Sequence, residues 1–238
     1  MAGYHFLVTC EHGGNRIPPR YRHYFRGHEA LLASHRGFDI GALAMARELA
    51  RALGAPLFSA TTSRLLIDLN RTRGHGDLYS EATRAAPAQV RRRILAEHYL
   101  PYRRQVEAHI AAAIGRGGRV LHISSHSFTP VLDGQPRNAD VGLLYDPARA
   151  EERQLCRRWQ AQLRRRAPRL KVRRNYPYRG VADGFVTYLR RRFPPAAYVG
   201  VELEINQKHA ASGRSWTALR RAVGAALQAA LDDLDAAA

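Results

Sequence analysis

Short apolar runs alternate along this chain with longer segments in which apolar residues recur every three or four positions. The runs lie at 4–9, 56–60, 65–67, 120–124, 141–145 and 199–205. Runs of this length are typical of buried strands, and the segments between them are long enough for helices. This alternation favours an α/β protein over a helical bundle or a β-sandwich. We predict a three-layer fold in which helices flank a mixed, mostly parallel sheet.

Four segments have the periodicity of helices with one buried face. They lie at 39–53, 95–110, 155–163 and 217–234. Gly54 follows the first segment and is typical of a helix end, since glycine adopts the left-handed conformation readily. Pro101 lies inside the second segment and predicts either a kink or a boundary between two helices.

The chain of 238 residues is long enough for one medium-sized domain, which we expect to span 1–238. No run of about 18 apolar residues occurs, and the first residues lack the pattern of a signal peptide. Cys10 and Cys156 lie far apart, without metal-binding or disulfide-framework spacing. We therefore expect a cytoplasmic protein in a reducing compartment, with no membrane partner.

The formal net charge of +18 is of the kind that marks nucleic-acid-binding surfaces. Only Lys171 and Lys208 are lysines, however, so the rest of the 38 basic residues are arginines, and alanine is abundant too. This composition indicates a coding bias and a solvated, arginine-rich surface. Nucleic acid is therefore not the partner that we expect.

Two predicted strands lead into a histidine. His12 follows the run 4–9 and precedes a glycine pair, and His126 follows the run 120–124. Neutral imidazole is a good zinc ligand, although a histidine at a strand end also serves as an ordinary hydrogen-bonding residue. Asp39, at the start of the helix 39–53, supplies either a third, carboxylate ligand or the N-cap of that helix.

Further polar side chains are expected at the same edge of the sheet. Glu202 and Glu204 alternate with aliphatic residues, so both carboxylates share one face. They supply either a general base with a raised pKa or the partner of an arginine. His122 shares a face with His126, and we expect it to be a hydrogen-bonded core histidine rather than a support for a ligand.

Arginines accompany these residues in two polar loops. Arg64 and Arg71, with Asn70, lie around the run 65–67, and Arg179 lies in a later loop. A guanidinium fork matches a carboxylate in a bidentate way, so this set could bind a substrate carboxylate. We assign Arg64, Asn70 and Arg71 to substrate binding and Arg179 to catalysis, in which it would stabilise the oxyanion of a tetrahedral intermediate, a role that is also open to the arginines of the first loop.

Five segments carry these polar residues in order along most of the chain. They are 11–15 (EHGGN), 63–71 (SRLLIDLNR), 125–128 (SHSF), 175–180 (NYPYRG) and 202–206 (ELEIN). Taken together, they resemble the N-formylglutamate amidohydrolase family. The resemblance implies the phosphorylase/hydrolase-like fold of zinc carboxypeptidases and aspartoacylases, with one zinc ion at the strand ends.

The resemblance also implies roles for individual residues. His12 and His126 become zinc ligands, Glu204 becomes the general base, and Arg64 a substrate-side arginine. The segment 68–71 looks like the substrate-binding segment of aspartoacylases. Those enzymes place a glutamate three residues after the first histidine, where this chain has Asn15. The third ligand is therefore Asn15, through its amide oxygen, or Asp39, or else the affinity for metal is low.

The expected function is zinc-dependent hydrolysis of the amide bond of N-formylglutamate or a similar N-acyl amino acid, with a small carboxylate-bearing molecule as the substrate. Another N-acylated or cell-wall peptide substrate is the first alternative. An alternative of another class is a metal-free protein on the same fold that binds anions or nucleic acid, which would show salt-sensitive binding and no zinc. The sequence leaves the oligomeric state open.

Overall fold

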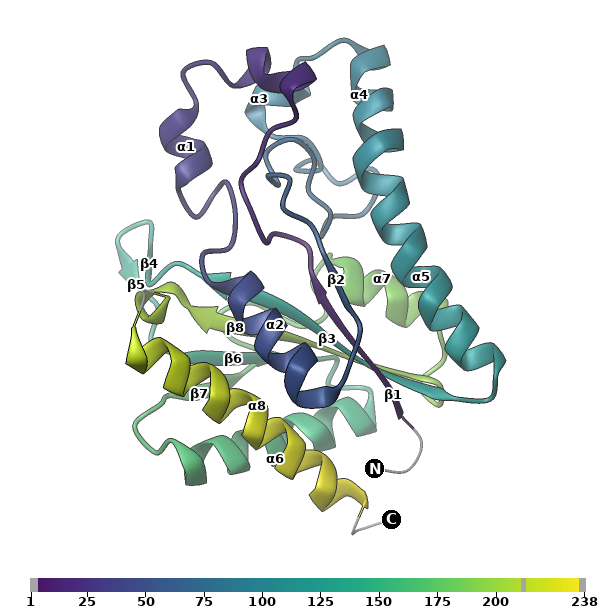
Figure 1. Cartoon of the computed structure of the whole chain (residues 1–238), viewed down its shortest axis with the longest axis vertical. Coiled ribbons are helices and arrows are strands. Elements are labelled where there is room, and N and C mark those ends of the chain that lie inside the picture. The colour runs from purple at the N-terminus through teal and green to yellow at the C-terminus, as the bar shows by residue number, and fades with distance from the viewer. Residues whose placement is uncertain (1–3, 211–212, 236–238) are drawn as a thin grey trace.

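The computed structural model describes residues 4–210 and 213–235 and contains a six-stranded mixed sheet (Figure 1). Its strand order is β2-β1-β3-β8-β6-β7. Neighbouring strands are parallel except β6 and β8, which are antiparallel. The strands are β1 (Tyr4–Cys10), β2 (Leu57–Ser59), β3 (Arg119–Phe128), β6 (Val141–Leu144), β7 (Val172–Arg174) and β8 (Tyr198–Asn206). The predicted mixed, mostly parallel sheet is confirmed.

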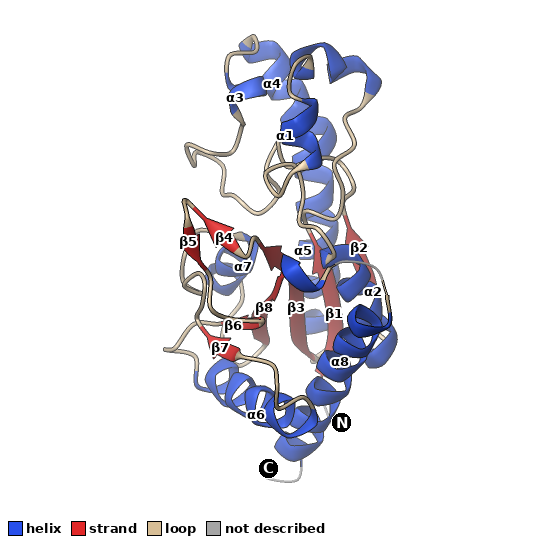
Figure 2. Cartoon of the chain, turned by 90° about the vertical axis from the view of Figure 1, so that its left-hand side faces the viewer, coloured by secondary structure: helices blue, strands red, loops and turns tan. Residues whose placement is uncertain are grey.

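Helices cover both faces of this sheet, as the two views show (Figures 1 and 2). On one face, α2 (Ala42–Leu53), α6 (Ala150–Arg166) and α8 (Arg214–Asp235) pack against alternate strand residues such as Val8 and Leu121. On the other, α5 (Leu100–Gly115) and α7 (Phe185–Arg192) pack against the intervening residues, such as Leu7 and Val120. The two buried faces explain why these strands read as continuous apolar runs.

Three predicted helices are confirmed with small changes at their ends. The segment 39–53 forms α2, and Gly54 ends it in the left-handed conformation with φ of 59°. The segments 155–163 and 217–234 lie within α6 and α8. Helix α7 was not predicted, because three of its eight residues are arginines and its apolar stripe is short.

The segment 95–110 continues a longer helical rod. Helix α4 (Ala88–Ile94) leads through the π-helical turn η2 (Leu95–Tyr99) into α5. In this turn the Leu100 amide donates to the Leu95 carbonyl, five residues back. Pro101 lies in the first turn of α5, where its missing amide hydrogen is tolerated and a wider turn precedes it. Of the two outcomes predicted at Pro101, a kink or a boundary between helices, the structure has a change from the π-helical turn to α5 just before it, within one continuous rod.

A smaller apolar cluster lies beyond the sheet, at the top of Figure 1. The short helices η1 (Pro19–Phe25), α1 (Glu29–Ala33) and α3 (Glu81–Arg84) accompany α4 there. The run 65–67 forms a turn rather than a strand, and its side chains are buried in this cluster. A two-stranded hairpin of β4 (Val131–Leu132) and β5 (Gln135–Pro136), and the turn η3 (Gln207–His209), complete the described elements.

No helix in the described parts of the chain is both long and apolar enough to span a membrane. The span of the predicted domain, 1–238, stays a prediction.

Candidate metal and catalytic site

The strand ends bring the predicted site residues together. His12 lies two residues after β1, His126 lies near the end of β3, and Glu204 lies beside His126 in the register of β3 and β8. Because β1, β3 and β8 are parallel, all three residues lie at the same edge of the sheet. This is the position at which open α/β sheets bind ligands.

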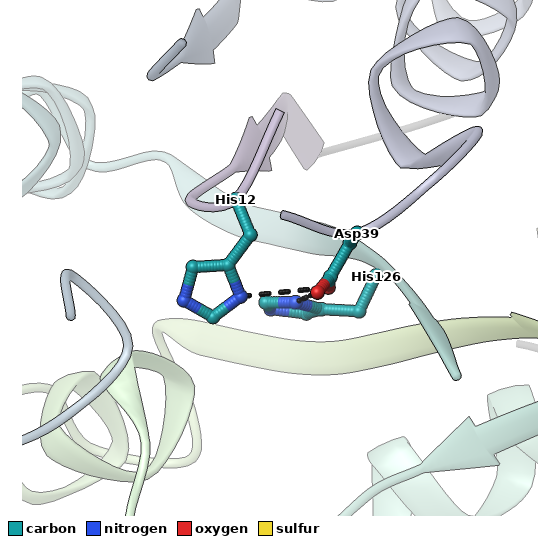
Figure 3. A group of neighbouring side chains, drawn as sticks. All are labelled: His12, Asp39 and His126. Carbon is teal, nitrogen blue, oxygen red and sulfur yellow. Dashed lines mark hydrogen bonds and ion pairs between the residues drawn. The ribbon is translucent and has the colours of Figure 1, made fainter. Parts of the chain in front are cut away.

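His12, Asp39 and His126 form a buried group whose ligand atoms lie within 4.8 Å of one another (Figure 3). The Asp39 Oδ2 atom lies 3.4 Å from His12 Nδ1 and 2.8 Å from His126 Nδ1. His12 Nδ1 is buried and has no hydrogen-bond partner among the described residues. Two imidazole nitrogens and a carboxylate oxygen thus lie close enough together to be candidate ligands of one metal ion.

Asp39 does not cap helix α2, whose N-cap residue is Gly41. Its carboxylate instead contacts the two histidines, and Arg64 Nη1 donates to Oδ1 at 3.3 Å. Burial alone would raise the pKa of Asp39, but His12 and His126 outweigh burial and hold it well below its ordinary value. Of the two roles predicted for Asp39, the structure favours that of a ligand.

Each histidine has a second carboxylate at its other ring nitrogen. His12 Nε2 lies 2.7 Å from Asp68 Oδ1. His126 Nε2 lies 3.2 Å from Glu11 Oε2, within ion-pair distance. Such carboxylates orient metal-binding imidazoles and fix their tautomers. The sequence reasoning assigned no role to Glu11, although its position beside His12 was visible, and it placed Asp68 only in a substrate-binding segment.

Asn15 is not brought into this group. Its side chain is exposed, and its amide donates to the Leu32 carbonyl at 3.1 Å. After His12 the chain runs along residues 60–61, since the Gly13 amide donates to the Ala60 carbonyl at 2.9 Å and the Arg16 amide donates to the Thr61 carbonyl at 3.0 Å. Gly14 permits this approach, because a Cβ atom there would lie 2.7 Å from the Thr61 carbonyl oxygen. The prediction of Asn15 as a metal ligand is therefore corrected, and Asp39 occupies the third position of the group.

Glu204 and Glu202 both face the site from β8, as their alternation predicted. Glu204 is 5% exposed, and its Oε2 atom has no hydrogen-bond partner among the described residues. Burial raises the pKa of Glu204 to about 8; His126 opposes this shift, and the carboxylates of Asp39 and Glu202 add to it. Burial also raises the pKa of Glu202. A carboxyl group with a pKa near neutrality can both accept and donate a proton.

The pocket above these residues has a volume of about 170 Å³. Arg64, Asn70, Arg71 and Arg179 all line it, together with Tyr178. Two of the arginines differ in their surroundings, because Arg64 donates twice to Asp68 whereas Arg179 is exposed at the pocket.

The loop that carries Asn70 and Arg71 is fixed to the first residue of α7 and to the segment before this helix. Asn70 Oδ1 accepts from the Phe185 amide at 2.7 Å, and Arg71 Nη1 donates to the Asp183 carbonyl at 3.0 Å. The Arg71 Nε atom is buried without a hydrogen-bond partner among the described residues. These contacts hold both side chains at the pocket.

His122 lies in the core beneath the site and lines no part of the pocket. Its ring nitrogens lie 2.8 Å from Thr9 Oγ1 and 2.7 Å from the Tyr198 hydroxyl. Burial lowers the pKa of His122 to about 4. The prediction of a hydrogen-bonded core histidine is confirmed.

Comparisons with known proteins agree with this architecture. A crystal structure of an Agrobacterium tumefaciens gene product superposes with a TM-score of 0.84 and 28% sequence identity, covering 98% of this chain and 92% of that one. An N-formylglutamate amidohydrolase of Ralstonia eutropha JMP134 superposes with a TM-score of 0.68 and 19% identity, covering 96% and 93%. The second likeness supports the fold alone. A search of curated proteins gives no match.

The N-formylglutamate amidohydrolase family matches residues 4–210. This segment contains all the residues of the site described above, from Glu11 to Glu204. The predicted resemblance is therefore confirmed, and the chain belongs to the N-formylglutamate amidohydrolase family.

Proposed function

We propose that this protein is a zinc-dependent amidohydrolase that removes the acyl group of N-formylglutamate or a similar N-acyl amino acid. The buried group of His12, Asp39 and His126, with Glu204 beside it, carries the proposal. Membership of the family supports the hydrolase class. Zinc, the substrate and a cytoplasmic location are parts of the proposal.

The three side chains fit a zinc ion by donor type and spacing. Two imidazoles and one carboxylate are a common set for catalytic zinc, with the fourth position left open. Zinc bonds of about 2.0–2.1 Å in a tetrahedron put neighbouring ligand atoms roughly 3.3 Å apart. The separation of His12 Nδ1 and Asp39 Oδ2 is 3.4 Å, and that of His126 Nδ1 and Asp39 Oδ2 is 2.8 Å. Both separations from Asp39 thus lie within about half an ångström of the tetrahedral value, and all the ligand atoms lie within 4.8 Å of one another.

When bound, zinc would polarise the amide carbonyl and make water a better nucleophile. Glu204 then has the environment of a general base, because its carboxyl group is buried and its Oε2 atom is unpaired among the described residues. It would take a proton from the attacking water and deliver it to the nitrogen of the leaving amine. The products are a carboxylic acid, formic acid for an N-formyl substrate, and the free amino acid.

The arginines of the pocket would bind different parts of the substrate. The charge of Arg64 is already balanced by Asp68 and Asp39, so Arg64 is suited to the neutral carbonyl and its developing oxyanion. Arg71 and Arg179 line the same pocket and are the candidates for the substrate carboxylates. The volume of about 170 Å³ favours a small N-acyl amino acid over a cell-wall peptide.

Elemental analysis and a hydrolysis screen test this proposal. Purified protein should contain about one zinc per chain, and His12→Ala and His126→Ala should lose it. The wild type should hydrolyse N-formylglutamate or a related compound within a panel of N-formyl and N-acyl amino acids. A wild type that takes up no zinc when the ion is supplied would exclude the mechanism. Salt-sensitive binding of nucleic acid by the same protein would then favour the metal-free alternative.

A further inference from the structure

Glu11 is a charged side chain for which the proposed reaction has no use. It is completely buried, and within the described parts of the chain no arginine or lysine forms an ion pair with it. Three groups surround its carboxylate: the Tyr102 hydroxyl donates to Oε1 at 3.0 Å, the Ser124 hydroxyl donates to Oε2 at 2.7 Å, and His126 Nε2 lies 3.2 Å from Oε2. An isolated buried carboxylate is costly, so this arrangement requires a compensating positive charge.

The compensating charge has to reach Glu11 through His126. His126 Nε2 lies 3.2 Å from Glu11 Oε2 at ion-pair distance, without a hydrogen bond to any described residue. A nitrogen lone pair that close to an ionised carboxylate would be repulsive, so the carboxylate favours a proton on Nε2. With the proton of the neutral ring at Nε2, the lone pair of the ring lies at Nδ1. That atom is hydrogen-bonded to Asp39 Oδ2 at 2.8 Å, so without a metal ion it also carries a proton, and a bound cation would take the place of that proton. A cation bound at Nδ1 would balance Asp39 directly and Glu11 through the ring.

We propose that Glu11 is a positioning residue for the metal site, which holds His126 in the tautomer and orientation that present Nδ1 to the ion. Tyr102 and Ser124 in turn hold the carboxylate of Glu11 in place. This inference rests on the proposed function, because it needs the His12, Asp39 and His126 group to bind metal. It extends the metal site to helix α5, because Tyr102, which holds Glu11, lies in that helix.

The corresponding carboxylate at His12 is in a different situation. Asp68 accepts from Arg64 at 3.1 and 2.7 Å, so its charge has a partner besides the histidine. Apart from His126, Glu11 has only hydroxyl donors, and hydroxyl groups supply no charge. Arg64 already neutralises much of the charge of Asp68, whereas no such residue neutralises Glu11. Glu11 should therefore stabilise a cation at His126 more than Asp68 stabilises a cation at His12.

Metal affinity tests the role of Glu11 without any substrate. Metal-free protein is titrated with Co²⁺, whose absorption reports coordination, and with Zn²⁺ against a chromophoric chelator. Glu11→Gln keeps the shape of the side chain and removes its charge, and it should weaken binding of both ions about 10- to 100-fold. Tyr102→Phe removes one hydroxyl from Glu11 and should weaken binding about 3- to 10-fold.

Tyr198→Phe is the matched control. It also deletes a buried tyrosine hydroxyl next to a histidine, but that hydroxyl lies 2.7 Å from His122 rather than beside Glu11. Its metal affinity should equal that of the wild type. Unchanged affinity in Glu11→Gln would overturn the inference, and so would an equal loss in Tyr198→Phe. If Glu11→Gln does not fold, Tyr102→Phe against Tyr198→Phe decides the question. Absence of metal binding by the wild type would instead refute the proposed function itself.

Discussion

Replacement of Glu204 by glutamine should make the metal-free protein more stable at alkaline pH, although it removes the proposed general base. Burial raises the pKa of Glu204 from 4.5 to about 8, with His126 opposing the shift and Asp39 adding to it. Ionisation of this carboxyl group in the folded protein is therefore unfavourable. Glutamine has nearly the same shape and carries no charge at any pH.

The sign of the effect follows from proton binding by the two states. Between the unfolded pKa of 4.5 and the folded pKa of about 8, the folded protein holds a proton at Glu204 that the unfolded chain has lost. The stability contributed by this group is thus complete below pH 4.5 and is lost as the pH rises to 8. Each pH unit corresponds to about 1.4 kcal/mol, so from about pH 5.5 to 8.5 the wild type loses roughly 3 kcal/mol relative to Glu204→Gln.

Urea unfolding of both proteins, stripped of metal by a chelator, measures this difference. Other titrating groups contribute to both proteins, so the difference in the free energy of unfolding between the variant and the wild type isolates Glu204. The advantage of Glu204→Gln should be roughly 3 kcal/mol larger at about pH 8.5 than at about pH 5.5. A difference that is the same at both pH values would refute the claim that Glu204 is held protonated by its surroundings.

Three further predictions concern turnover and stability. Glu204→Gln should lower kcat about 10²- to 10⁴-fold with unchanged zinc content, measured by steady-state hydrolysis and elemental analysis. Arg103→Met should raise KM about 10-fold with a smaller change in kcat, because Arg103 Nη1 donates to the Leu69 and Arg71 carbonyls and so fixes the loop that carries Asn70 and Arg71. Equal KM values for the variant and the wild type would contradict this prediction. Arg190→Met should destabilise the protein by about 3–5 kcal/mol in urea unfolding, because it leaves the buried Glu152 carboxylate without its partner; a loss below about 1 kcal/mol would contradict this.

The sheet and its edge could be predicted from the sequence because strands buried on both faces leave long apolar runs. The runs 4–9, 120–124 and 199–205 lie within β1, β3 and β8, and parallel pairing brings the residues at their carboxyl ends together. The run 65–67 shows the limit of this reasoning. Its side chains are equally apolar, but they are buried among short helices, without pairing to a strand. An apolar run of three residues indicates burial without indicating the backbone conformation.

The composition of the metal group could be predicted only in part. His12 and His126 were visible because each follows an apolar run, whereas the choice between Asn15 and Asp39 depended on the direction of the chain after the glycine pair. After that pair, backbone hydrogen bonds hold the chain beside residues 60–61, and Gly14 lies against Thr61, which is 47 residues away in sequence. Spacing along the chain carries no information on such a contact.

The acidic side chains of the site are all buried, so the differences between their pKa values come from the groups that each of them contacts. Asp39 and Asp68 each contact a histidine and Arg64, and these partners lower their pKa values despite burial. Glu204 lacks such a contact, and burial raises its pKa to about 8. Carboxylates held in the ionised form are suited to binding a cation or to supporting its ligands, whereas a carboxyl group that exchanges its proton near neutral pH is suited to acid–base chemistry. The environments thus separate the carboxylates proposed to hold the metal or its ligands from Glu204 and its neighbour Glu202, whose pKa values are both raised by burial.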